Sequence, residues 1–221
     1  MNRTIKTSSS IVAPRRDLCI DFANTRYFRG SEPVETVHDF PEMVRWCDTN
    51  AMLGRDASER ALQWSEKHGR DAAAIFDDAM ALRETIYRIC FALADGKTTE
   101  ARDVASINAS LDRAPERRVL AHHEKTFGWR IDRDALSAAG LLAPVLWSAG
   151  DLMVSPDLTR LRHCLNEKCG WLFMDDSKNG SRRWCSMQSC GNRAKAHRHY
   201  LRSKRPVATG DAVKKSGGDA Q

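Results

Sequence analysis

Four of the seven cysteines lie within 27 residues of the chain, in two pairs of equal spacing. Each pair has the form Cys-x4-Cys, and 15 residues separate Cys164 and Cys169 from Cys185 and Cys190. Two close pairs with a hairpin-sized spacer are typical of a structural zinc site, since each pair can sit on a tight turn and aim two thiolates at one ion. Four thiolates complete a tetrahedron and leave no open position. The pattern therefore predicts one structural Zn²⁺.

Other interpretations of these cysteines stay open. A four-cysteine set can also hold an iron–sulfur cluster, and His163, His197 or His199 could replace one cysteine as a ligand. A disulfide set fits poorly, because the number of cysteines is odd and the N-terminus has no apolar signal segment. The remaining cysteines are expected in the core: Cys19, Cys47 and Cys90.

A basic segment surrounds and follows the cysteines. Residues 160–205 hold 12 basic and 3 acidic side chains, whereas residues 1–159 hold 21 and 24, so the net charge of +6 belongs to the C-terminal part. The run 191–205 is free of proline and, after Gly191, of glycine, which predicts a helix that starts at the last ligand. The less basic face of this helix is expected to pack on the zinc module through Ala194, His197, Tyr200 and Leu201.

Lys195, Arg198, Arg202 and Arg205 follow one another at steps of three and four residues and so form a basic stripe along one face of this helix. Such a stripe can bind the phosphates of a nucleic acid, and arginine can also read guanine edges. The candidate nucleic-acid contacts are the stripe and its basic neighbours: Arg182, Arg183, Arg193, Lys195, Arg198, Arg202 and Arg205. Charge alone would also fit a solvated basic face. Gly191 and Asn192 have a second interpretation, as residues that constrain the helix start.

Polar side chains cluster near the N-terminus, around the segment 18–24, whose alternation predicts a strand. Asp21, Asn24 and Arg26 could line a small-molecule pocket at the strand exit, or Asp21 and Asn24 could satisfy backbone groups in a turn. The sequence has no phosphate-binding glycine loop, HExxH or nucleophile elbow. We therefore expect a binding protein rather than an enzyme.

The elements that must position these residues are mostly helical. The strongest helix is predicted over 71–94, an apolar helical stretch over 134–154 should split at Pro144, and residues 117–122 and 126–131 should form a hairpin. Residues 171–174 and 182–184 are expected to pair around Asn179 and Gly180. The expected fold class is α+β, with a helical N-terminal domain containing a small sheet and a treble-clef-like zinc module at the C-terminus.

The expected organisation is a flexible lead over 1–14, a regulatory domain over 15–155, a zinc module over 156–205 and a disordered tail over 206–221. The 221 residues, 42% hydrophobic and 29% charged, are ordinary for a soluble globular protein. The longest uncharged run, 135–150, is too short to cross a membrane. We expect a cytoplasmic protein with reduced thiols.

The C-terminal residues resemble the signature of the CGNR zinc-finger family, in the runs 169–171 (CGW), 183–187 (RWCSM) and 190–195 (CGNRAK). The N-terminal part resembles the ABATE domain that accompanies it, in 18–25 (LCIDFANT) and 82–84 (LRE). The resemblance spans residues 15 to 205. It implies a stress-induced transcription regulator of the bacterial kind, with a zinc-binding, DNA-binding C-terminal module.

Charge, cysteine spacing and the basic stripe together predict a DNA-binding regulator whose N-terminal domain senses a small-molecule effector or forms a homodimer. Structured RNA is an alternative partner, because its phosphates could bind the same basic side chains. A protein-interaction module with a purely structural zinc would account for the cysteines alone.

Overall fold

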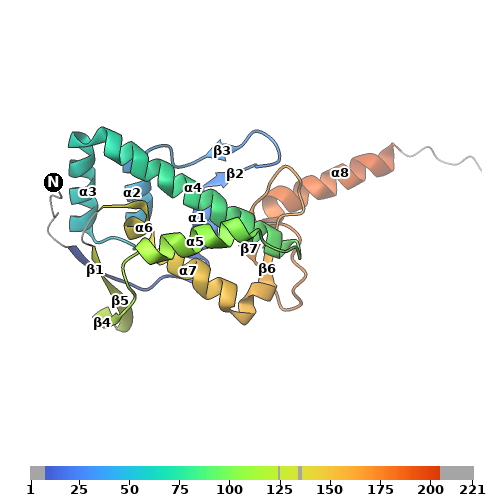
Figure 1. The fold of residues 1–221 in the computed structure, drawn as a ribbon. Helices are drawn as coiled ribbons and strands as arrows, with labels where there is room; N and C mark the ends of the chain where they lie inside the picture. Colours follow the sequence, from blue (N-terminus) through green and yellow to red (C-terminus); the bar gives the residue numbers. More distant parts are fainter. Residues whose placement is uncertain (1–7, 124, 134–135, 205–221) are drawn as a thin grey trace, which may run out of the picture.

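The computed structural model describes residues 8–123, 125–133 and 136–204. A helical body carries a small sheet at one end, and the C-terminal helix projects from the other (Figure 1). The helices are α1 (Leu18–Ala23), α2 (Phe40–Thr49), α3 (Arg55–Lys67), α4 (Gly69–Ala94), α5 (Ala101–Arg113), α6 (Ala138–Leu141), α7 (Ala143–Val154) and α8 (Asn192–Ser203). The strands are β1 (Ser8–Val12), β2 (Arg26–Tyr27), β3 (Val34–Glu35), β4 (Val119–His123), β5 (Thr126–Arg133), β6 (Leu161–His163) and β7 (Leu172–Met174). The α+β fold class is confirmed.

The antiparallel sheet has the order β1-β5-β4. The predicted hairpin is β4–β5, and β1 pairs along the other edge of β5, with Val12 opposite Trp129. A flexible lead over 1–14 is therefore wrong for residues 8–12, while residues 1–7 lie outside the described part. The physical reason is burial, because Val12 and Ile131 pack with Trp147 in one apolar cluster.

The strand predicted over 18–24 is instead the short helix α1. Its apolar residues Leu18, Cys19, Ile20 and Phe22 are all buried. The segment is therefore covered on nearly every side, and the alternation of apolar and polar residues does not distinguish a strand from a helix here. It packs between α4 and α7, and the backbone N–H of Cys19 donates to Ser148 Oγ at 3.1 Å.

Long helix α4 runs through the middle of the body (Figure 1) and buries Ala79, Leu82, Ile86 and Ile89. The predicted split of the apolar stretch occurs where expected, because α6 ends at Leu141 and α7 starts at Ala143 with Pro144 in its first turn. Among the described helices, none combines the length and the apolar character that a bilayer span requires.

The hairpin predicted from 171–174 and 182–184 is wrong in its second strand. β7 pairs with β6, placing Leu161 opposite Met174, because Leu161, Leu172 and Met174 complete the main apolar core. Residues 182–184 form a loop whose Arg183 carbonyl accepts a hydrogen bond from Leu165 N–H at 3.0 Å.

Candidate metal centre and nucleic-acid interface

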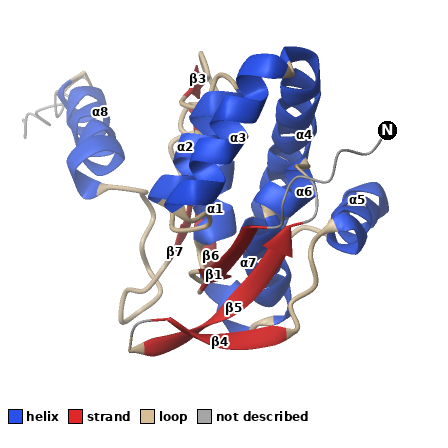
Figure 2. Ribbon diagram, turned by 90° about the vertical axis from the view of Figure 1, so that its left-hand side faces the viewer, coloured by secondary structure: helices blue, strands red, loops and turns tan. Residues whose placement is uncertain are grey.

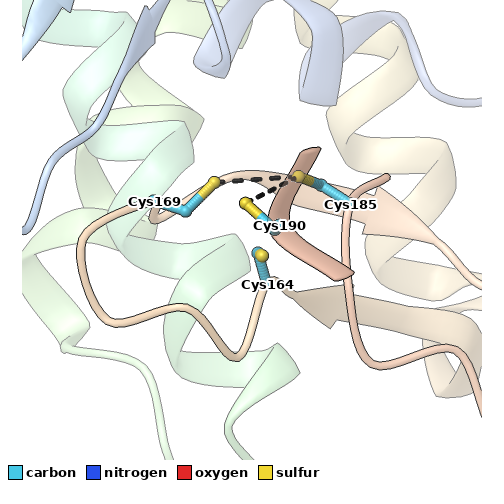
Figure 3. A group of neighbouring side chains, drawn as sticks. All are labelled: Cys164, Cys169, Cys185 and Cys190. Atoms are coloured by element: carbon cyan, nitrogen blue, oxygen red, sulfur yellow. Dashed lines mark hydrogen bonds between the residues drawn. The ribbon is translucent and has the colours of Figure 1, made fainter. Parts of the chain in front are cut away.

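The first cysteine pair lies at the two ends of a tight knuckle between β6 and β7. The N–H of Cys164 donates to the Trp171 carbonyl at 2.8 Å, and the N–H of Cys169 donates to the Asn166 carbonyl at 2.7 Å. Gly170 follows with φ at +66°, a left-handed conformation that favours glycine. The knuckle thus turns both thiols toward the same point (Figure 3).

The second pair enters from the root of α8. A π-helical turn over Met187–Gly191 contains Cys190 and leads directly into the helix. A Cβ on Gly191 would lie 2.7 Å from Met187 Sδ and 3.4 Å from Trp184 Cδ1, so the turn packs closely against these side chains. Asn166 Nδ2 donates to Cys190 Sγ at 3.4 Å, which ties the turn to the knuckle.

The four sulfurs have the geometry that a tetrahedral metal needs (Figure 3). Cys185 Sγ lies 3.7 Å from Cys169 Sγ and 3.8 Å from Cys190 Sγ, and all four Sγ atoms lie within 4.8 Å of one another. A tetrahedron with Zn–S bonds of about 2.3 Å has S–S edges of about 3.8 Å. The residues therefore fit one zinc ion, closed on all four sides, which is a structural site.

Hydrogen bonds between the thiols of the cluster also shift their pKa values. The Cys169 thiol hydrogen-bonds to Cys164 and lowers the pKa of Cys164 to about 2, and the same contact raises the pKa of Cys169 to about 12. The hydrogen bond to Cys164 raises the pKa of Cys185 as well. Thiolates this close to one another repel, so a cation bound between them would favour their joint ionisation.

Helix α8 carries the basic stripe and stands clear of the body. Lys195, Arg198 and Arg202 are exposed along one face, and none of the residues of α8 is buried. The expected packing of the opposite face is wrong: Ala194 is half-buried, His197 is exposed, and Tyr200 and Leu201 are 51% and 53% exposed. Among the described residues, the apolar cluster at the zinc site consists of the ligand cysteines with Trp171 and Trp184, and no residue of α8 belongs to it.

The other predicted contacts are placed differently. Arg182 Nε donates to the Trp184 carbonyl at 3.0 Å and its guanidinium lies 4.5 Å from the centre of the Phe173 ring, so Arg182 holds the loop before Cys185. Arg183 and Arg193 are exposed; the guanidinium of Arg193 lies 5.7 Å from the centre of the Phe28 ring. Arg205 lies outside the described residues.

Comparison with protein families decides the relationship. A model of the ABATE family, described as "Putative stress-induced transcription regulator", matches residues 16–156, and a model of the CGNR zinc finger matches residues 160–203. The chain belongs to the ABATE family. The resemblance seen in the sequence is therefore confirmed over both parts. No curated protein matches the chain.

Within the ABATE part, the predicted pocket residues have separate partners. The Asn24 side chain is buried and bonds the backbone of Leu172 twice, accepting from its N–H at 3.0 Å and donating to its carbonyl at 2.9 Å. Asp21 accepts from Arg15 Nη2 at 2.5 Å, and Arg26 lies 3.9 Å from Glu84. Asn24 thus joins the ABATE part to the CGNR zinc finger rather than lining a pocket.

Sequence reasoning missed the residues that hold the knuckle from outside. Tyr87 Oη donates to the Gly170 carbonyl at 2.9 Å, and burial raises the pKa of Tyr87 to about 12, which keeps the hydroxyl protonated. Arg29 N–H donates to the Cys169 carbonyl at 3.3 Å. Both residues are far from the cysteines in sequence, and only the fold brings them together.

Proposed function

We propose that this protein binds duplex DNA through the basic stripe of α8 and thereby regulates transcription. In this proposal zinc fixes the root of the helix, and the chain is a cytoplasmic binding protein rather than an enzyme.

The observation that carries the proposal is the exposure of α8, none of whose residues is buried. The helix has 12 residues, so it is about 18 Å long, and it projects beyond the other helices (Figure 2). A major groove is about 12 Å wide and admits one α-helix. A helix that no neighbouring element covers can enter such a groove without rearrangement of the body.

Electrostatics supports the same partner. Lys195, Arg198 and Arg202 present three positive charges on one face, with Arg183 and Arg193 near the root of the helix. Phosphate contacts of this kind release counterions, which makes the affinity fall with salt.

The test replaces Lys195, Arg198 and Arg202 together by alanine, which keeps the helix propensity high. Three lost phosphate contacts should lower the slope of log affinity against log salt by about 2.7 and weaken binding at low salt by at least about tenfold. Fluorescence anisotropy on a duplex over a salt series measures both.

The matched control replaces Arg60, Lys67 and Arg70, three exposed basic residues at the α3 end of the body. It changes the net charge equally and should leave affinity and slope unchanged. The proposal fails if the α8 variant behaves like this control. A structured RNA competitor that displaces the duplex at equal or lower concentration would assign RNA as the partner.

For the ABATE part we propose that a small-molecule effector binds in a cavity of about 290 Å³ between α4, α5 and α6. Asp78, Ser106, Ser110 and Arg113 give it a polar lining, near the lower end of the volumes of ligand pockets. Native mass spectrometry should show a bound small molecule that Ala81→Phe, at the cavity wall, removes. Dimer masses in the same spectra would support the homodimer instead.

A further inference from the structure

Three consecutive residues of the ABATE part, Phe28–Gly30, touch the CGNR zinc finger at two places. Arg29 N–H donates to the carbonyl of the ligand Cys169 at 3.3 Å. A Cβ on Gly30 would lie 1.8 Å from the Glu167 carbonyl oxygen, so backbone meets backbone there. Phe28 lies under the guanidinium of Arg193, in the first turn of α8. One short segment thus contacts both the knuckle and the root of the helix.

This segment is itself held rigidly. The Arg29 side chain is only 12% exposed and forms two hydrogen bonds to the Glu84 carboxylate, at 2.6 and 3.2 Å. Its guanidinium also donates to the Ala23 carbonyl at 3.0 Å and lies 3.7 Å from the centre of the Tyr87 ring. Tyr87 in turn donates to the Gly170 carbonyl. Helix α4 is therefore connected to the knuckle through Arg29 and Tyr87.

The zinc finger supplies little support of its own. Its separate apolar cluster consists of ligand cysteines together with Trp171 and Trp184, whereas Leu172 and Met174 belong to the core of the ABATE part. A knuckle without its own core owes its shape to the metal and to the surface on which it lies.

We propose that Phe28–Gly30 and Tyr87 are positioning residues for the zinc site. They hold the knuckle in its ligating geometry before the metal binds, so the ABATE part sets the zinc affinity of the CGNR finger and fixes the root of α8. Groups that orient metal ligands from outside the coordination shell typically change metal affinity 10–100-fold.

The sharpest test is steric. Gly30→Ala adds one methyl group where the Glu167 carbonyl lies, and the φ of Gly30 is not in the left-handed region, so the backbone itself accepts alanine. The matched control is Gly69→Ala, whose new Cβ meets open space. Competition with a chromophoric chelator should show zinc affinity reduced about 10–100-fold in Gly30→Ala and unchanged in Gly69→Ala.

A second pair of variants separates positioning from general stability. Tyr87→Phe removes the hydrogen bond to Gly170 and should weaken zinc binding about tenfold. Arg88→Ala, next to Tyr87 on α4, breaks an ion pair at 2.6 Å with Asp103 of α5, and should lower the unfolding midpoint without changing zinc affinity. The d–d bands of cobalt-loaded Tyr87→Phe should keep the wild-type positions, because all four thiolates remain.

Unchanged zinc affinity in both Gly30→Ala and Tyr87→Phe would overturn the proposal, because the knuckle would then be self-sufficient. Equal weakening in Arg88→Ala would overturn it too, since the effect would follow stability. None of these measurements involves nucleic acid, so they can succeed or fail independently of the function proposed above.

Discussion

At the scale of residues, the four sulfurs and the guanidinium of Arg83 both place charge inside the protein, and each needs a partner of opposite charge. The thiolates need a cation among them. Arg83, with 3% of its side chain exposed, pairs with both oxygens of Glu35 at 2.6 and 2.7 Å and with Glu84 at 3.1 Å. Buried charges are tolerated only when they are paired in this way.

Replacing Arg83 by methionine keeps much of the side-chain volume and leaves Glu35 without its partner. Removing one partner of a buried ion pair leaves the other charge unpaired, and this should lower the free energy of unfolding by about 3 kcal/mol. Urea unfolding of the zinc-saturated protein measures this loss. The exposed Arg60→Met should change the stability by less than about 0.5 kcal/mol, and an Arg83 effect equally small would contradict the account.

Glu84 gives the molecule a defined acid sensitivity. Burial alone would raise its pKa, yet the hydrogen bond from Arg29 and the charges of Arg29, Arg83 and Arg26 bring the pKa below its ordinary 4.5. A lowered pKa in the folded state adds stability above pH 4.5, and this stability is lost as the pH falls through the folded value.

The stability difference between wild type and Glu84→Gln should therefore be largest above pH 4.5 and shrink on acidification. Unfolding midpoints of both proteins across pH 3 to 7 test this. A difference that stays constant over the whole range would show that the carboxylate charge is not responsible. Glu66→Gln, exposed on α3, serves as the control.

At the scale of elements, the sequence predicts what local pattern determines. Helix α4, the split at Pro144, the β4–β5 hairpin and a helix after Cys190 all follow from periodicity, proline or turn chemistry. The segment 18–24 misled because burial on all sides removes the periodic signal. The pairing of β7 with β6 depends on which strand fills the core, and contacts such as Asn24 with Leu172 require the complete fold.

Helix α8 depends on its root. A 12-residue helix with few tertiary contacts is marginal in water. Helix α8 is connected to the protein through Cys190, through the contact of Arg193 with Phe28 and through the turn in which Gly191 N–H donates to the Ser186 carbonyl at 3.0 Å. Chelation of zinc should therefore speed hydrogen exchange in residues 192–203 to nearly the rate of an open chain, while buried amides of α4 stay protected. Unchanged exchange in α8 after chelation would contradict a zinc-anchored helix.

At the scale of the whole molecule, a body with a net charge of −3 over residues 1–159 carries a basic helix at its edge. The main hydrophobic core contains residues of both parts, and Arg16 joins them again through Asp157 and Asp176 at 3.1 and 3.0 Å. This arrangement presents α8 to a partner in a fixed direction from the body, and it makes the metal a condition for doing so.

The most direct measurement of the central claim is a selection from random duplex DNA by the zinc-loaded protein, with a chelated sample in parallel. The account predicts retention that rises as salt is lowered, that enriches a sequence motif and that disappears on chelation. Two half-sites one helical turn apart in the enriched motif would indicate that the protein binds as a dimer. No retention of duplex DNA at low salt, or retention that survives removal of zinc, would contradict it.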